Sequence, residues 1–233
     1  MIIVDKLIKR FGDSLAVNGI SFSVAPGELF ALLGPNGAGK TTTINCLLGF
    51  VAPDGGRLSL AGVDVVADPG AARRELAYIP EQVSLYGNFT AVENLRYFSE
   101  LTGHRYSDRE IRQFLSNTGL DARAHDVRLE KYSKGMRQKV AIALVLAKQA
   151  KVLLLDEPTS GLDPSASHDF SGLLRTLRDR GVAILMATHD LFRAKQDATQ
   201  VGLMRRGELV RTLSAADLSH ADLEQLYVTT MSD

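Results

Sequence analysis

Glycines separate a strand-forming run from a helix-forming run near position 40, and this order constrains the fold more than any other feature. The strand-forming run covers residues 28–33, and Gly-Pro-Asn-Gly-Ala-Gly-Lys-Thr follows it directly at residues 34–41. Gly34, Gly37 and Gly39 let the backbone adopt positive φ and turn successive N–H groups inward, which makes an anion-binding concavity. The helix that begins there adds its positive end to the same place. The order therefore predicts a strand, a phosphate-binding loop and a helix.

The side chains of this loop supply what a triphosphate needs. Lys40 can reach the β and γ phosphates, and Thr41 offers a hydroxyl to Mg²⁺. An ordinary glycine turn is the alternative, and a lysine and a hydroxyl in this order disfavour it. We therefore expect ATP or GTP to bind with Mg²⁺ through Gly34, Pro35, Asn36, Gly37, Ala38, Gly39, Lys40, Thr41 and Thr42.

Composition narrows the class of protein. The chain has 233 residues, 45% of them hydrophobic, which is enough for a substantial core. Lys plus Arg and Asp plus Glu both number 27, so the totals imply no broad basic face for nucleic acid. The first residues lack a signal-peptide pattern, and no apolar run approaches the ~20 residues that span a bilayer. We expect a protein kept in the cytosol. Its single cysteine, Cys46, is expected to be a buried apolar residue rather than a reactive thiol.

The N-terminal part reads as a β-rich lobe around the phosphate loop. Residues 2–24 alternate apolar and polar positions around turn signals at 12–13 and 18–19, which predicts two or three antiparallel strands. Further short strands are expected over residues 57–60 and 63–66.

The middle of the chain reads as helical. Capping boxes at residues 90–93 and 107–110 each predict a helix start, and Gly103 and Gly119 predict the corresponding ends. The first helix is expected to bury Leu101 with its other apolar residues. We expect a helical subdomain over about residues 86–145.

The last part has the pattern of a parallel sheet. A buried strand is expected over 152–155, a helix over 165–180 and a second strand over 182–186. Strands around residues 206–207 and polar helices near 215–230 complete the chain. The predicted fold is α/β, with a phosphate-loop core built on a parallel sheet, an antiparallel β subdomain and a helical insert. We expect one domain over residues 1–233, whose core takes about 1–85 and 146–233.

Two adjacent carboxylates follow the predicted strand at 152–155. The carboxyl end of such a strand lies beside the phosphate loop, so Asp156 is suited to hold Mg²⁺ and Glu157 to orient and polarise water. A surface Asp-Glu pair that opens a loop is the alternative reading.

A second anion site is predicted before the helical run at 140–147. Ser133 can cap that helix, and Gly135 allows close backbone approach, some 95 residues after the first site. Simple capping of the helix explains the segment equally well when it is considered alone.

These motifs occur in the order found in the nucleotide-binding subunits of ATP-binding cassette (ABC) transporters, which the chain resembles over nearly its whole length. Residues 34–42 resemble the Walker A motif, 132–136 the signature motif, 152–157 Walker B and 160–163 the D-loop. The resemblance also makes His189 the switch histidine and Phe11 the aromatic that stacks on adenine.

The resemblance implies an ATPase that works as a head-to-tail dimer. ATP at one Walker A motif is then completed by Ser133 and Gly135 of the second subunit, with Asp163 also at the nucleotide. Glu157 positions water and His189 contacts the γ-phosphate. The helical subdomain and the segment before it would grip integral membrane permease subunits, which places the protein peripherally on the cytoplasmic face of the cell membrane. The second subunit is an identical chain or a related cassette.

Two positions depart from the family pattern. The Q-loop usually has glutamine after the strand, whereas here Glu81 takes that position and Gln82 follows; we favour Glu81 for this role near the γ-phosphate and Mg²⁺. The signature has Lys134 and Met136 at positions of its first glycine and its glutamine. Lys134 binds phosphate in trans or faces solvent, and we favour solvent. This form of the signature is similar to that of bacterial export-type ABC ATPases.

Two other functions compete with an exporter subunit. A soluble ABC ATPase that acts on ribosomes, DNA or cofactor assembly shares the motifs. The translation factors of the family typically carry two cassettes on one chain, whereas this chain has one. Its zero net charge also disfavours nucleic acid as a partner. A metabolic kinase with a phosphate loop is the third candidate, and the signature segment and the D-loop disfavour it because a kinase has no use for them.

Overall fold

The computed structural model describes residues 1–232, which form two compact units. The first unit contains Met1–Tyr78, Lys151–Pro158 and the chain from Leu177 onward. The second contains Ile79–Ala150 and Thr159–Thr176. Each unit is built around its own cluster of buried apolar side chains.

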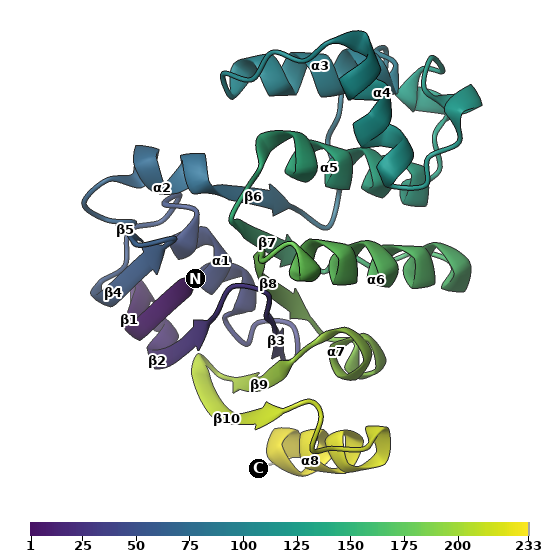
Figure 1. Cartoon of the computed structure of the whole chain (residues 1–233). Coiled ribbons are helices and arrows are strands. Elements are labelled where there is room, and N and C mark those ends of the chain that lie inside the picture. The colour runs from purple at the N-terminus through teal and green to yellow at the C-terminus, as the bar shows by residue number, and fades with distance from the viewer. Residues whose placement is uncertain (233) are drawn as a thin grey trace. The chain divides into compact units, whose positions relative to one another are not determined.

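An antiparallel sheet forms the β lobe of the first unit. Its strands lie in the order β2 (Ser14–Val24), β1 (Ile2–Phe11), β4 (Gly55–Leu60) and β5 (Val63–Asp64) (Figure 1). The turn expected at residues 12–13 is confirmed. The turn expected at 18–19 is wrong, because both residues lie inside β2, where the pairing shifts from Leu7 with Ile20 to Ile8 with Asn18. Gly19 has φ +67° at this β-bulge, so the glycine bends a strand rather than ending it.

A six-stranded sheet forms the rest of the first unit's scaffold. Its order is β10 (Glu208–Ser214), β9 (Gln200–Arg205), β3 (Leu29–Leu33), β8 (Ala183–Thr188), β7 (Val152–Asp156) and β6 (Leu76–Ile79) (Figure 1). β3 pairs in parallel with β8 and β9, and β7 pairs in parallel with β8. Every residue of β3, β7 and β8 is buried, as expected for strands covered on both faces.

The helices of the first unit are α1 (Lys40–Leu47), α2 (Pro69–Glu75), α7 (Leu191–Asp197) and α8 (His220–Ser232). The strand expected over 63–66 is only partly correct, because β5 ends at Asp64 and α2 soon follows. The Asp68 carboxylate accepts a hydrogen bond from the Ala71 N–H at 2.8 Å, and Pro69 starts the helix. On α1, Cys46 is buried as predicted, and burial raises the pKa of its thiol to about 11.

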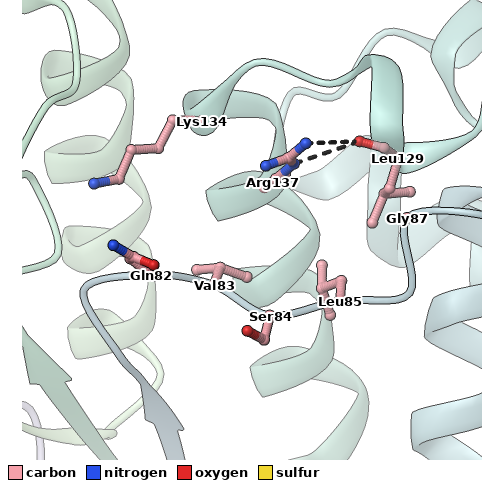
Figure 2. A pocket seen from close by; sticks show the side chains of 8 residues that line it. All are labelled: Gln82, Val83, Ser84, Leu85, Gly87, Leu129, Lys134 and Arg137. Atoms are coloured by element: carbon pink, nitrogen blue, oxygen red, sulfur yellow. Dashed lines mark hydrogen bonds between the residues drawn. The ribbon is translucent and has the colours of Figure 1, made fainter.

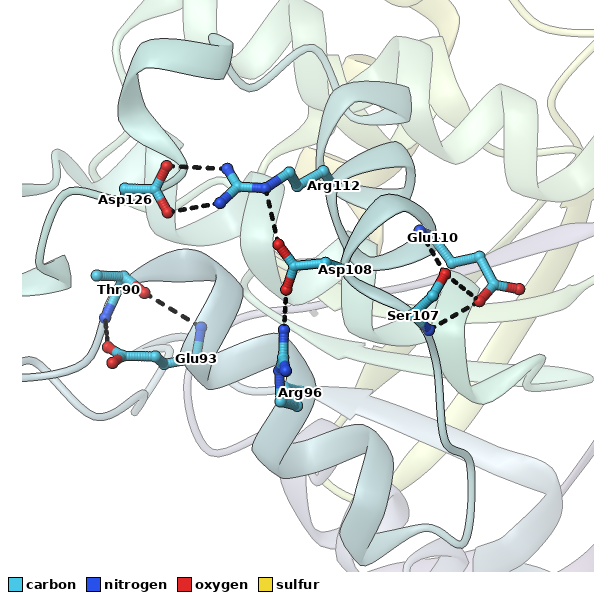
Figure 3. A network of polar contacts seen from close by, with 8 residues as sticks. All are labelled: Thr90, Glu93, Arg96, Ser107, Asp108, Glu110, Arg112 and Asp126. Atoms are coloured by element: carbon cyan, nitrogen blue, oxygen red, sulfur yellow. Dashed lines mark hydrogen bonds and ion pairs between the residues drawn. The ribbon is translucent and has the colours of Figure 1, made fainter.

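The second unit is mostly helical. It contains α3 (Ala91–Leu101), α4 (Asp108–Asn117), α5 (Lys134–Lys148), the start of α6 (Pro164–Asp179), and single 3₁₀ turns at Ala122–Ala124 and Leu129–Lys131. Both predicted capping boxes are confirmed, and Figure 3 shows them beside an ion-pair network in which Arg112 joins Asp108 and Asp126. The prediction for Leu101 is wrong, since its side chain is 65% exposed at the end of α3.

The second unit is larger than the helical insert expected over 86–145. It begins at Ile79 and includes Thr159–Thr176, so most of α6 belongs with α5. The Lys139 ammonium on α5 pairs with the Asp169 carboxylate on α6 at 2.8 Å. The sequence pattern assigns α6 to the parallel sheet because it follows a buried strand, and a pattern of this kind carries no information about which helices pack together. No helix within residues 1–232 is long and apolar enough to cross a membrane.

Candidate functional site

The glycines of the phosphate loop are required by close backbone contacts and by positive φ. A Cβ at Gly34 would lie 2.2 Å from the Met204 carbonyl oxygen on β9, so any side chain there would displace the backbone. Gly39 has φ +106° and occupies the N-cap of α1 without offering a side-chain acceptor. The first N–H groups of α1 therefore lack a side-chain cap, which leaves the positive helix end suited to an anion.

Lys40 is held inside the loop although it carries a charge. Its side chain is only 6% exposed. The Nζ atom donates hydrogen bonds to the carbonyl oxygens of Gly34 at 2.6 Å and Pro35 at 3.2 Å, and it lies 3.6 Å from Glu157 Oε1. Phosphate oxygens can replace these carbonyl partners without moving the lysine into water. The loop therefore has a buried cation ready for an anionic ligand.

Glu157 lies directly after β7 with an unusual backbone conformation. Its φ is +46°, a left-handed value that glutamate rarely adopts, and its N–H donates to the Ala187 carbonyl at 2.9 Å. The Oε2 atom accepts hydrogen bonds from the Thr188 hydroxyl and the His189 N–H, both at 3.3 Å. It also lies 2.9 Å from His189 Nδ1. These contacts fix the carboxylate between Lys40 and His189.

The other carboxylate oxygen of Glu157 is buried and has no hydrogen-bond partner among the described residues. A buried acceptor of this kind usually has a functional explanation. Here the oxygen faces the Lys40 ammonium and has capacity for a further donor, such as a water molecule. The arrangement can polarise that water and accept its proton.

Thr41 and Asp156 place two oxygen ligands side by side. The Thr41 hydroxyl donates to Asp156 Oδ1 at 3.3 Å, one at the start of α1 and the other at the end of β7. Hard oxygen donors of this kind suit Mg²⁺, which takes its remaining ligands from phosphate and water. Residues 1–232 contain no cluster of three or more His, Cys, Asp or Glu side chains that could hold a metal.

Burial, together with the negative charges of Asp156 and Glu157, raises the pKa values of two tyrosines. Burial, followed by the charge of Asp156, raises the pKa of Tyr78. Burial, followed by the charge of Glu157, raises the pKa of Tyr227 on α8. The C-terminal helix therefore lies within electrostatic range of Glu157, which no sequence motif indicates.

Phe11 ends β1 with half of its side chain exposed. The exposed fraction is 51%, and the Lys9 ammonium lies 5.2 Å from the ring centroid. An exposed ring is available for stacking on a flat ligand. This exposure is inconsistent with a position in the core.

The predicted second anion site belongs to the second unit. The Ser133 hydroxyl caps α5 by accepting from the Met136 N–H at 3.2 Å. A Cβ at Gly135 would lie 2.9 Å from the Ala166 Cβ, so close packing of α5 on α6 alone requires glycine. The Asp163 carboxylate caps α6 by accepting from the Ala166 N–H at 2.9 Å. All three residues thus have structural roles in the unit itself.

Glu81 and Lys134 both contact Ser160, also within the second unit. The Ser160 hydroxyl donates to Glu81 Oε1 at 2.9 Å, and the Lys134 ammonium donates to the Ser160 carbonyl. Lys134 is half-buried, so the expectation that it faces solvent is wrong. Gln82 lines a neighbouring pocket, which Figure 2 shows with its other lining residues: Val83, Ser84, Leu85, Gly87, Leu129, Lys134 and Arg137.

The structure therefore divides the predicted site residues between the units. The first unit brings together Lys40, Thr41, Asp156, Glu157 and His189. The residues predicted for the second anion site and the Q-loop lie in the second unit: Glu81, Gln82, Ser133, Gly135 and Asp163.

Two residues at these sites were missed from the sequence. Thr188, which bonds Glu157, immediately precedes the predicted switch histidine. Ser160 opens the predicted D-loop, but only the fold shows its two partners.

Comparisons with known proteins identify the family to which the chain is similar. The family described as ABC transporter matches residues 17–160. YbhF, a probable multidrug ABC transporter ATP-binding protein of Escherichia coli (strain K12), is 36% identical over 215 residues, which cover 91% of this chain and 37% of YbhF. The chain thus spans little more than a third of that relative's length. The Nod factor export ATP-binding protein I of Paraburkholderia xenovorans (strain LB400) is 38% identical over 208 residues, covering 88% of this chain and 68% of that protein.

A solved structure of an ATP-binding subunit of an ABC transporter matches the whole fold. The TM-score is 0.85 with 31% identity, and the match covers 98% of each chain. The predicted α/β fold class is thereby confirmed.

Proposed function

The chain belongs to the ABC transporter family, and from this premise we propose that it binds and hydrolyses ATP to drive export through separate membrane-spanning subunits. The cluster around Lys40 supports this proposal most strongly. It combines a buried cation in a phosphate loop with a carboxylate, Glu157, one oxygen of which faces that cation and accepts no hydrogen bond from the described residues. A binding module without catalysis does not need such a carboxylate.

In this proposal the site residues of the first unit have the following roles, which their contacts support. The loop N–H groups and Lys40 bind the β and γ phosphates, and the exposed ring of Phe11 stacks on adenine. Glu157 accepts a proton from the attacking water while the water oxygen bonds to the γ-phosphorus. The bond from that phosphorus to the β–γ bridging oxygen breaks, so ADP and phosphate are released. His189, held by Glu157 through Nδ1, contacts the γ-phosphate. Thr41 and Asp156 hold Mg²⁺, which neutralises phosphate charge when it is bound. Glu81 is a further candidate ligand because of its position in the sequence alone.

The second unit supplies the groups that act on a second copy. The N-terminus of α5, capped by Ser133, faces the γ-phosphate of ATP held by the partner cassette, and Gly135 and Asp163 contribute beside it. The Q-loop residue, Glu81 or Gln82, is not one of these groups, and its proposed role is to sense the γ-phosphate. In this scheme ATP holds two cassettes together, and its hydrolysis lets them separate.

The partners and direction are proposed from relatives. The names of similar proteins include multidrug transport, Nod factor export and linearmycin resistance, which favours export. The permease subunits are integral membrane proteins, and through them the cassette lies on the cytoplasmic face of the cell membrane. The second cassette is a copy of this chain or a related one.

A pull-down from detergent-solubilised membranes tests the proposal. Tagged chain, with ATP present, should enrich an integral membrane protein and should release phosphate from ATP in a purified assay. Recovery of ribosomal proteins, or of no membrane protein at all, would argue against a transporter subunit. Transfer of phosphate to a small metabolite instead of water would indicate a kinase.

A further inference from the structure

We infer that Lys134 and Glu81 act together as positioning residues, which fix the loop at 159–163 against the start of α5. The inference rests on the proposed function, because this loop and the start of α5 carry the groups offered to the second cassette: Ser133, Gly135 and Asp163. All the contacts that support it lie within the second unit.

Ser160 is bound from two directions by side chains of opposite charge. Its hydroxyl donates to Glu81 Oε1 at 2.9 Å, and its carbonyl accepts from the Lys134 ammonium. One contact fixes the side chain and the other fixes the backbone. Because the residues at 81, 134 and 160 come from three separate stretches of sequence, this arrangement ties those stretches together at one residue.

The place of Lys134 in α5 does not account for a lysine. It is the first residue of the helix, where the partial positive charge of the helix end disfavours a cation. The side chain is also half-buried rather than extended into water. Its bond to the Ser160 carbonyl offsets both disadvantages. The hydrogen bond to the Ser160 carbonyl therefore explains why a lysine occupies this position.

The loop after Ser160 transmits this restraint to the nucleotide-facing residues. Gly161 turns the chain with φ +65°, and the Leu162 N–H donates to the Thr159 carbonyl at 3.1 Å. Asp163 follows and caps α6 through the Ala166 N–H. Only two residues separate Ser160 from Asp163, so fixing Ser160 fixes the start of α6 relative to the start of α5.

Loss of either contact should loosen the loop without changing how one cassette binds ATP. Apart from Glu81, which none of the variants below changes, the residues proposed to hold ATP in cis lie in the first unit. The loop is proposed to act on ATP of the second cassette. We therefore expect a lower kcat with an unchanged Kd for ATP. A defect confined to folding would instead lower the thermal stability and would not separate kcat from Kd.

Hydrogen–deuterium exchange of the peptide that covers residues 159–163 measures the loop directly. Lys134→Met keeps the length of the side chain and removes its charge and donor, and exchange should become about tenfold faster, as expected for the loss of one charge-assisted hydrogen bond. Lys134→Arg should restore slow exchange. Lys131→Met, at an exposed lysine three residues earlier, is the matched control and should leave exchange unchanged.

Ser160→Ala tests the Glu81 half of the arrangement, since it removes only the hydroxyl. Exchange should again be faster, and adding Lys134→Met should have a less than multiplicative effect if the two contacts cooperate. Unchanged exchange in both single variants, or equal acceleration in Lys131→Met, would overturn the inference. Exchange needs no catalytic activity, so faster exchange in a chain that hydrolyses no ATP would preserve this inference while refuting the proposed function.

Discussion

Replacing Glu157 with glutamine separates its two roles, as an acceptor for the proton of water and as an anion beside Lys40. The Lys40 ammonium lies 3.6 Å from Glu157 Oε1. At an effective dielectric constant of about 20, two unit charges at that separation attract by about 5 kcal/mol before desolvation and screening. Glutamine removes this attraction but retains an oxygen, and Lys40 keeps its two carbonyl partners.

In this variant the phosphates of ATP replace the Glu157 carboxylate as the negative charge beside Lys40. We expect the Kd for ATP to fall about tenfold, which corresponds to ~1.4 kcal/mol and is a modest share of the Coulomb attraction. Turnover should fall by about 10²–10⁴, the usual contribution of a general base. Because hydrolysis no longer separates the cassettes, the variant with ATP should elute at twice the mass of the 25.3 kDa chain.

Titration calorimetry, phosphate release and size-exclusion chromatography measure these three effects. Glu75→Gln is the matched control, because Glu75 also pairs with a lysine, Lys151, at 2.9 Å but lies outside the phosphate loop. The reasoning fails if Glu157→Gln binds ATP more weakly than the unaltered chain, or if its turnover stays within a factor of ten. A monomer in the presence of ATP would refute the dimer.

Four further changes test the loop and the second anion site. Lys40→Ala should weaken ATP binding at least tenfold in calorimetry, since it removes a buried phosphate partner; unchanged affinity would contradict its role. Ser133→Arg should leave the Kd for ATP intact but prevent dimerisation and turnover, and normal turnover would mean that the signature segment does not act in trans. Gly34→Ala should lower the free energy of unfolding in urea by about 3 kcal/mol or more, because its Cβ would lie 2.2 Å from the Met204 carbonyl. Gly37→Ala, with no atom within 4 Å, should cost only about 1 kcal/mol for its positive φ.

Features set by neighbouring residues could be predicted from the sequence. Both capping boxes, the Ser133 cap and the helix ends near Gly103 and Gly119 depend on contacts three or four residues apart. The phosphate loop and the two acids at the end of β7 are likewise local patterns, and the geometry at Lys40 agrees with them.

Features that depend on contacts between residues far apart in the chain could not be predicted from the sequence. An asparagine–glycine pair favours a hairpin turn, yet pairing with β1 made Gly19 a bulge inside β2. Packing of α5 on α6, which moves residues 159–176 into the second unit, leaves no periodic trace in either helix alone. The partner of Lys134 was missed for the same reason, because Ser160 lies 26 residues further along the chain.

The left-handed backbone of Glu157 bears on how this protein responds to selection for heat resistance. Glycine or asparagine would relax the conformation at that position, where glutamate bears strain on the order of 1 kcal/mol. A library of variants screened only for survival at high temperature should therefore accumulate glycine or asparagine at position 157. The same variants should lose ATP turnover. If Glu157 has its proposed role, the strained backbone persists because hydrolysis requires the carboxylate, and a substitution that relieves the strain would lower activity.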